Sequence, residues 1–240
     1  MPAPNLRAFA EKVAVVTDAG NAFGRAVALQ LALQGCYVIA GFAAESAENA
    51  SALNELQSLG TLASAVAADV STDAGVNALF ETVAQTYGRL DLLVNTVLFE
   101  PKAKTLTVNA ADFDRAVNQT LRAAFFCRQT GVELMRNRPN AAIVNLIGET
   151  ANNSLSTMIR SAVVGLTESL AIELAPRVRV NCVTWKAAAQ IENQAEFSLL
   201  RQPTAVAPDD AARACLYFLS PEAAALSGQT LIVQPKARKI

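Results

Sequence analysis

The sequence predicts an α/β protein built on a doubly wound parallel sheet. Short apolar runs alternate along the whole chain with segments whose apolar residues recur at helical spacing, and turn residues separate them. No linker, repeat or low-complexity stretch divides the chain, and 240 residues suit one core of this class. Residues 1–240 are therefore expected to form a single three-layer domain, with the sheet between two layers of helices.

The first strand, the first helix and the second strand are predicted near the N-terminus. Residues 12–17 form a short apolar run bounded by turn residues, which predicts a strand. Residues 25–34 have helical spacing and stop at Gly35, a residue typical of a helix C-terminus. Residues 37–40 supply the next apolar run, so the order strand, helix, strand is expected here.

The same alternation continues along the rest of the chain. Helices are predicted over residues 47–59, 73–87, 111–136, 156–174 and 209–219. Strands are predicted over residues 63–67, 90–95, 142–146, 178–183 and 230–233. Alternating units of this length place parallel strands side by side with helices on both faces, which is the Rossmann arrangement.

Composition argues against several classes of partner and site. The net charge is −1 with scattered basic residues, which disfavours nucleic acid and anionic membranes as partners. No segment resembles a signal peptide, and no apolar run reaches the roughly 18 residues of a membrane span, so a cytoplasmic protein is expected. The chain has no histidine, and its four cysteines are widely spaced, so no metal site is expected. Only 17% of residues are charged, so an oligomer is expected to cover part of the surface.

Several segments, in order and spacing, resemble a known enzyme family. Residues 163–176 read VVGLTESLAIELAP and residues 177–183 read RVRVNCV. With Asp69 before Val70, LDLLVN at 90–95 and SGQTL at 227–231, they resemble the short-chain dehydrogenase/reductases, a family of NAD(P)-dependent oxidoreductases. The resemblance covers nearly the whole chain and implies the same Rossmann fold.

The tyrosine and lysine that the family uses in catalysis are replaced in this chain. The resemblance implies a helix opening with Y-x-x-x-K, in which the tyrosine transfers the proton that accompanies hydride transfer. Counting back from Gly165 places the tyrosine position on Ser156 and the lysine position on Arg160. A serine hydroxyl is a far weaker acid than a phenol, and arginine holds its proton too tightly to relay it.

The other two positions of the family's catalytic tetrad are altered as well. The resemblance places its asparagine on Thr120 and its serine on or beside Gly148. A different gap in the following loop would bring Thr150 or Ser154 toward the site.

Few other side chains are candidates for proton transfer. Glu149 is the one plausible acid or base, and Lys186 would enter from the opposite wall, although loop charges of this kind are usually solvated. The three tyrosines, Tyr37, Tyr87 and Tyr217, fall on predicted elements that place them away from the cleft.

The phosphate-binding loop departs from the family pattern T-G-x-x-x-G-x-G. The stretch after the first strand reads TDAGNAFG at residues 17–24, so only Gly24 of the three family glycines remains, while Gly20 occupies an unrestricted position. Asp18 replaces the first glycine and adds like charge if it faces the phosphates. Ala22 replaces the second glycine and crowds the closest approach to the pyrophosphate.

Of the other positions that contact the cofactor in the family, some are replaced in this chain and some are kept. Gly41 and Phe42 stand where an acid would bind the adenosine ribose, with Glu45 a few residues on. Asp69 and Asn95 remain, but either residue can be kept for folding alone, because each caps a turn or a strand end.

Two motifs that border the cofactor are lost. TVL at residues 96–98 replaces the A-G that makes room for adenine, and Trp185-Lys186 replaces P-G beside the nicotinamide. Trp185 is large enough to occupy nicotinamide volume. No cofactor is therefore expected, with Gly20, Gly24, Asp69 and Asn95 as remnants of the site.

The leading hypothesis is a catalytically inactive subunit that supports an active paralogue. The pairing surface is expected on the helices around 111–136 and 156–174, in a hetero- or homo-oligomer. Two-subunit members of the family provide the precedent, such as a 2-(hydroxybenzyl)succinyl-CoA dehydrogenase that pairs an active with an inactive chain.

Three alternatives stay open. The first is an active NAD(P)-dependent oxidoreductase with an atypical site. The second is a cofactor-independent enzyme similar to the halohydrin dehalogenases, which Arg160 fits but which would need a serine and tyrosine that this chain lacks. The third is a small-ligand sensor that uses the crevice at the switch point of the sheet.

Overall fold

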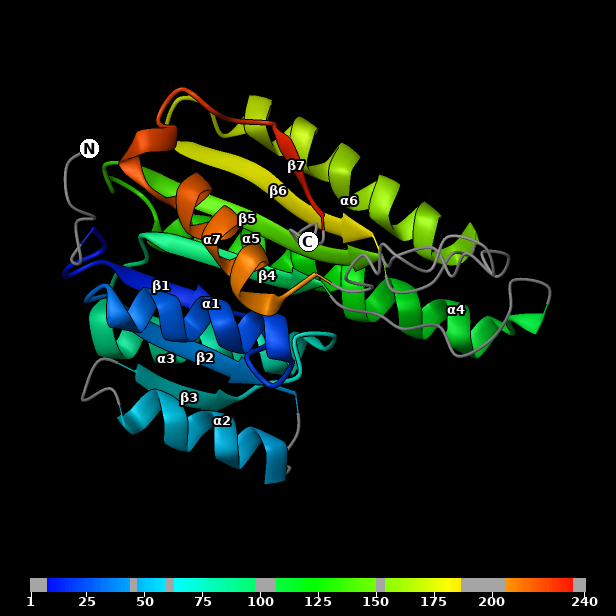
Figure 1. The fold of residues 1–240 in the computed structure, drawn as a ribbon, viewed down its shortest axis with the longest axis horizontal. Helices are drawn as coiled ribbons and strands as arrows, with labels where there is room; N and C mark the ends of the chain where they lie inside the picture. The colour runs from blue at the N-terminus through cyan, green and yellow to red at the C-terminus, as the bar shows by residue number, and fades with distance from the viewer. Residues whose placement is uncertain are drawn as a thin grey trace, which may run out of the picture.

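The computed structural model describes residues 8–43, 47–58, 63–97, 107–149, 154–186 and 206–234. Its seven strands are parallel and ordered β3-β2-β1-β4-β5-β6-β7, so the order reverses between β1 and β4, and the predicted doubly wound sheet is confirmed (Figure 1). The strands are β1 (Val13–Val16), β2 (Tyr37–Phe42), β3 (Ala63–Ala67), β4 (Leu92–Val97), β5 (Ala141–Glu149), β6 (Val178–Lys186) and β7 (Thr230–Val233).

Helices cover both faces of the sheet in a single three-layer domain (Figure 1). One face is covered by α1 (Ala22–Leu33), α2 (Ala47–Ser58) and α7 (Pro208–Leu219), which a short 3-10 turn, η3 (Pro221–Ala223), follows. The other face is covered by α3 (Asp73–Tyr87), α4 (Ala110–Val117), α5 (Ala123–Leu134) and α6 (Ser154–Glu173).

The central strands lie in the core and are apolar on both faces. All four residues of β1 have no exposed surface, because α1 packs on one side of this strand and α3 and α5 on the other. Fully burying a valine stabilises the fold by about 1.5–3 kcal/mol. This is why short uninterrupted apolar runs, rather than alternating ones, predict the strands correctly.

The carboxyl ends of the strands extend further than the apolar runs predict. β5 reaches Glu149 rather than residue 146, and β6 reaches Lys186 rather than residue 183, because the two strands stay paired over Gly148 and Trp185. α1 begins at Ala22 rather than residue 25. These extensions bring more residues to the edge of the sheet where a dinucleotide would lie.

The long helix predicted over 111–136 is divided into three parts. A π-helical turn, η2 (Asn118–Arg122), joins α4 to α5 without a break in the helical rod. Thr120 lies in this turn and is fully buried, whereas Asn118 is exposed. π-Turns of this kind occur often at functional sites, which draws attention to Thr120.

α6 is the most apolar of the long helices. By length and composition α6 is apolar enough to cross a membrane, since its most apolar 18-residue window has a mean hydropathy of 1.2. This corrects the expectation that no segment is long and apolar enough for a membrane span. Val163, Thr167 and Leu170 of α6 nevertheless lie in the core, and helices that pack in a protein core meet the same criterion. Its outward side is also apolar in part, since Met158 is 43% exposed and Ile172 is 81% exposed.

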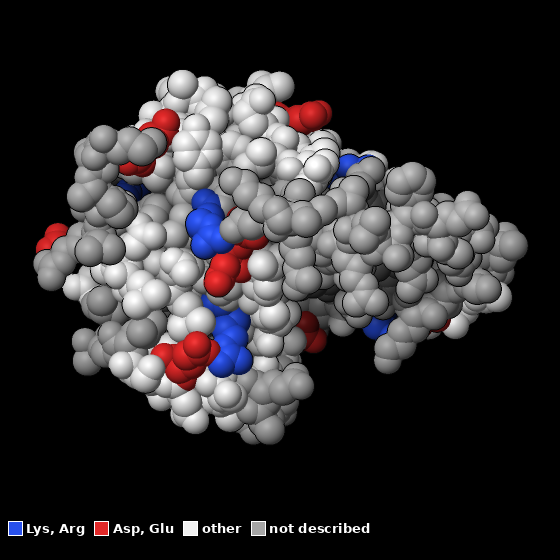
Figure 2. Space-filling view, in the orientation of Figure 1, with Lys and Arg blue, Asp and Glu red and all other residues white. Residues whose placement is uncertain are grey.

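Surface charges are paired rather than gathered by sign. On the face covered by α1, α2 and α7, Figure 2 shows basic side chains next to acidic ones. Arg25 of α1 bonds to Glu55 of α2, and Arg213 of α7 bonds to Asp210 in the same helix. Among the residues that the structure describes, this face offers no broad basic surface to an anionic polymer.

Candidate functional site

The candidate site lies at the carboxyl edge of the sheet, near the switch point between β1 and β4. Ligands of doubly wound sheets bind in the crevice at this position. The walls that the structure describes are the turn between β1 and α1, the ends of β4, β5 and β6, and the first turns of α6.

Side chains of the turn between β1 and α1 accept hydrogen bonds from three of its backbone N–H groups. The Asn21 side-chain oxygen accepts hydrogen bonds from the N–H groups of Phe23 (3.1 Å) and Gly24 (2.9 Å). The Asp18 carboxylate accepts from the Gly20 N–H (2.9 Å) and from the Asn21 side-chain amide (3.0 Å). Three of the N–H groups at the start of α1, where a pyrophosphate would bind, are therefore bonded to the chain's own side chains.

Sequence reasoning missed the capping role of Asn21. Asparagine is among the preferred N-cap residues, so its place before Ala22 was a readable signal. The cap starts α1 one turn earlier than the apolar pattern predicts, and Asp18 holds Asn21 in place through its backbone carbonyl as well (2.9 Å).

The two glycines kept in this loop serve close packing. A Cβ atom on Gly24 would lie 1.9 Å from the Asp18 carbonyl oxygen, and one on Gly20 would lie 2.4 Å from the Asn49 side-chain oxygen of α2. Gly24 is needed for the packing of α1 against the loop, with or without a ligand, because its neighbour is backbone, whereas the Asn49 side chain opposite Gly20 is able to move.

Trp185, at the end of β6, stacks on Phe23 in the first turn of α1. The ring centroids are 3.8 Å apart and the planes are inclined by 17°. The indole is only 4% exposed and belongs to the apolar cluster of the α1 and α7 face. Gly148 lies opposite Trp185 in the β5–β6 ladder, and a Cβ atom there would lie 2.4 Å from the indole Cζ2. The indole thus covers the space that a side chain at position 148 would need.

The two polar remnants of the cofactor site take part in the fold. Asp69 accepts a hydrogen bond from the Ser71 N–H (3.0 Å) in the turn before α3. Asn95 donates to Asn145 (2.9 Å), which donates in turn to Thr167 of α6 (2.9 Å), all three being buried. These contacts give both residues a structural role, as the sequence allows.

The four tetrad positions contribute no phenol and no amine. Thr120 donates its hydroxyl hydrogen bond back to the Ala116 carbonyl within the helix. Ser156 and Arg160 lie in the first two turns of α6, with Ser156 only 7% exposed. With Gly148 beneath Trp185, the side chains at these positions are two hydroxyls and one guanidinium.

None of the three tyrosines lies at the carboxyl edge. Tyr37 begins β2 and packs on Tyr87 at the end of α3, with ring centroids 5.4 Å apart. Burial raises the pKa of Tyr87. Tyr217 lies on α7 and is 47% exposed.

Ser154, another candidate from the sequence, begins α6 and is exposed. The candidates Glu45 and Thr150, and the side chains of Glu149 and Lys186, lie outside what the structure describes.

The four cysteines are buried and form no disulfide, and within the described ranges no group of three acidic or cysteine side chains is placed to hold a metal. Burial raises the pKa of Cys127 and of Cys182 to about 12. It raises the pKa of Cys36 and Cys215 as well. Uncharged thiols in apolar surroundings are inert, so they are not candidates for a nucleophile.

We predict that these thiols make the protein less stable in mild alkali. Above a pH of about 8.5 the thiols of the unfolded chain ionise while those of the folded chain stay protonated, so the free energy of unfolding falls by up to about 1.4 kcal/mol per pH unit for each thiol. Urea unfolding between neutrality and pH 9.5 measures the slope. The Cys127→Ala variant should show a shallower slope, and an unchanged slope would refute the prediction.

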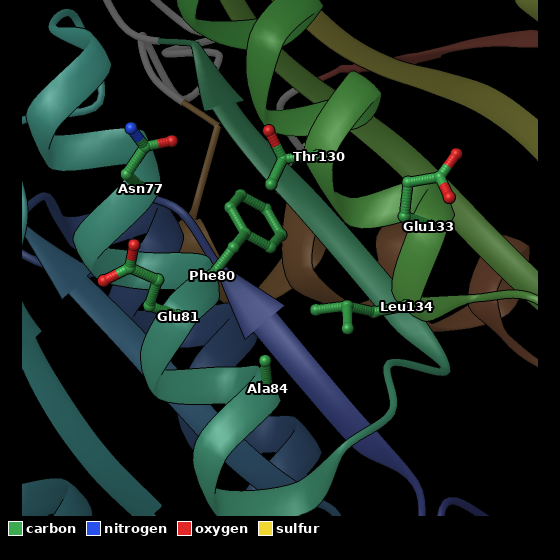
Figure 3. Close-up of a pocket in the computed structure, with 7 residues that line it drawn as sticks. All are labelled: Asn77, Phe80, Glu81, Ala84, Thr130, Glu133 and Leu134. Atoms are coloured by element: carbon green, nitrogen blue, oxygen red, sulfur yellow. The ribbon is translucent and has the colours of Figure 1, made fainter.

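A shallow groove lies far from this edge, between α3 and α5 (Figure 3). Its floor is apolar, and its rim bears the carboxylates of Glu81 and Glu133, which disfavour an anionic ligand. It is lined by Asn77, Phe80, Glu81, Ala84, Thr130, Glu133 and Leu134. No candidate residue of the sequence lies in this groove.

Known proteins resemble the chain over most of its length. The family model described as enoyl-(acyl carrier protein) reductase matches residues 19–234. The (2S)-[(R)-hydroxy(phenyl)methyl]succinyl-CoA dehydrogenase subunit BbsD of Thauera aromatica is 28% identical over 237 residues, covering 92% of this chain and 94% of the relative. The 3-oxoacyl-[acyl-carrier-protein] reductase FabG of Staphylococcus aureus is 30% identical over 178 residues, covering 72% of each.

Solved structures share the fold. A short-chain dehydrogenase/reductase from Serratia marcescens superimposes with a TM-score of 0.81 at 23% identity, covering 94% of this chain and 97% of that one. A dehydrogenase/reductase from Sinorhizobium meliloti superimposes with a TM-score of 0.82 at 23% identity, covering 95% and 96%.

Proposed function

The chain belongs to the short-chain dehydrogenase/reductase family of oxidoreductases, and we propose that it is a non-catalytic subunit that pairs with an active member of that family. The observation that supports this proposal is the tetrad. The resemblance places its four positions on Thr120, on or beside Gly148, and on Ser156 and Arg160, and none of these residues supplies an acid that gives up a proton near neutral pH.

The cofactor of the family is a nicotinamide dinucleotide, which accepts or donates the hydride. The residues of this chain do not fit it at the two places where the fit can be examined. The loop donors are bonded to Asp18 and Asn21, and the indole of Trp185 lies against Phe23 at the end of β6. The partner would therefore supply both the bound cofactor and the Y-x-x-x-K motif.

The proposed pairing surface is formed by the outward sides of α4, η2, α5 and α6. Phe113 of α4 and Phe125 of α5 are 42% and 40% exposed, and Met158 and Ile172 of α6 are exposed as well. Only 39% of the most apolar window of α6 is buried in the chain itself. Exposed apolar side chains concentrated on helices are typical of a surface that another subunit covers.

A multi-subunit enzyme also has a precedent among the relatives, since the protein from Thauera aromatica is named as a subunit of a dehydrogenase acting on a succinyl-CoA derivative.

We propose the cytoplasm as the location, because four cysteines that form no disulfide suit a reducing compartment.

An active NAD(P)-dependent oxidoreductase is the second candidate. The names of its relatives favour it, because they are dehydrogenases and reductases. It requires another proton donor at the carboxyl edge in place of the missing phenol. The dehalogenase-like and ligand-sensor hypotheses stay predictions, since no described contact favours either.

Native purification from the source organism tests the subunit proposal. We expect a tagged chain to bring down a family member that contains Y-x-x-x-K, and the complex but not the lone chain to oxidise a hydroxyacyl thioester with NAD(P). The Ile172→Glu variant should reduce recovery of the partner about tenfold or more, because it buries a charge in the interface.

Two controls make this test specific. Leu33→Glu changes an equally aliphatic, 57% exposed residue on α1, the opposite side of the sheet, and should leave partner recovery unchanged. The Ser156→Tyr/Arg160→Lys variant of the lone chain should stay inactive, since it restores the acid but not the cofactor site. Turnover by the unmodified lone chain would favour the second candidate instead.

A further inference from the structure

We infer that the chain closes its own dinucleotide crevice at both ends, with Trp185 and Phe23 in place of the nicotinamide half and Asp18 and Asn21 in place of the pyrophosphate. The inference concerns this chain alone and holds whether or not it has a partner. Three sets of contacts lead to it.

The first is the aromatic stack. Phe23 belongs to the helix whose N-terminus would face the pyrophosphate, and Trp185 ends the strand that would border the nicotinamide. A bound dinucleotide has to pass between these two elements. Rings whose centroids are 3.8 Å apart are in van der Waals contact, so no third ring fits between them.

The second is the fit of the indole over Gly148. A Cβ atom at this position would lie 2.4 Å from Cζ2, 2.7 Å from Cε2 and 3.0 Å from Cη2 of Trp185. Side chains and the indole thus exclude one another here. A serine at position 148 and the indole of Trp185 in this place are therefore sterically incompatible.

The third is the occupied phosphate loop. Three backbone N–H groups, those of Gly20, Phe23 and Gly24, donate to Asp18 or Asn21. A phosphate would have to displace both side chains and approach the Asp18 carboxylate, so it meets competition for donors and repulsion of like charge.

Thermal unfolding with added dinucleotide tests the closure. NAD⁺, NADH, NADP⁺ and NADPH are added separately to the purified full chain at millimolar concentration. A ligand present at about 100 times its Kd raises the Tm of a domain this size by roughly 5–10 °C. We expect no shift with any of the four, and a shift of that size with any one would overturn the inference.

The fluorescence of Trp185, the sole tryptophan, tests the stack itself. Phe23→Leu should move the emission to longer wavelength and increase quenching by acrylamide, because the indole loses its covering ring. Phe80→Leu, in the apolar cluster of the opposite face, is the matched control and should leave both unchanged. Unchanged emission in a folded Phe23→Leu variant would contradict the stack.

These outcomes separate the inference from the proposed function. Dinucleotide binding without turnover would overturn the closed crevice and leave the non-catalytic subunit intact. Partner-free turnover would overturn both.

Discussion

Gly148→Ala is expected to destabilise the protein by about 1–3 kcal/mol, yet to be almost neutral once Trp185 is removed. The added methyl group would lie 2.4 Å from the indole, and the indole has little freedom to move because it is buried and stacked on Phe23. In the Trp185→Ala background the same methyl group meets a cavity instead.

A double-mutant cycle measured by urea unfolding checks this coupling. Trp185→Ala alone should cost about 3–5 kcal/mol, the usual loss for a large buried aromatic side chain. The double variant should be more stable than the sum of the two single effects predicts, by more than about 1 kcal/mol. Additive effects would mean that the indole does not lie over Gly148.

The second large effect is expected from Arg179→Met, which should lower the free energy of unfolding by about 3 kcal/mol or more. The guanidinium of Arg179 is buried beneath the end of α7, and burial lowers its pKa. It stays protonated nonetheless, because arginine does not lose its proton in proteins. Its two terminal nitrogens donate to four backbone carbonyls, those of Phe218 (2.6 Å), Ala223 (3.1 Å), Leu219 (3.4 Å) and Ser220 (3.1 Å).

These carbonyls end α7 and the short turn after it, where orphan acceptors and the negative end of the helix dipole both favour a cation. Methionine keeps the volume but removes the guanidinium donor from all four carbonyls, of which those of Ser220 and Ala223 also accept from a backbone N–H, that of Ala223 (3.3 Å) and that of Leu226 (2.9 Å) respectively. Urea unfolding measures the loss, and amide hydrogen exchange should locate it at the end of α7. Arg177→Met, at an exposed position just before β6, is the matched control and should change stability by less than about 0.5 kcal/mol. Equal effects of the two substitutions would refute the role of Arg179.

Much of the fold could be predicted because it depends on local patterns. The run in β1 and the helical spacing of α3 appear within windows of a few residues, and the structure places both as expected. The predicted ends failed where side-chain caps and strand pairing take over from apolar spacing. α1 starts at Ala22 because of Asn21, and β5 and β6 continue to Glu149 and Lys186 because of their shared ladder.

The candidate site could be predicted only in part. The sequence identifies which side chains stand at the tetrad positions, since identity is read directly once the spacing is known. It does not reveal that the Thr120 hydroxyl bonds to Ala116, or that Asp18 bonds to the loop rather than pointing at a ligand. Those outcomes depend on side-chain orientation, which periodicity does not determine.

The sequence by itself determined the fold class, the order of the elements and the absence of Y-x-x-x-K, because each is a property of neighbouring residues. Only the tertiary structure decided that Phe23, Gly148 and Trp185 meet. They come from a helix and two strands far apart in the chain. Trp185 meets Gly148 because β5 and β6 pair there, and it meets Phe23 because the first turn of α1 reaches the end of β6. A contact of this kind follows from the packing of layers, which no local pattern of residues specifies.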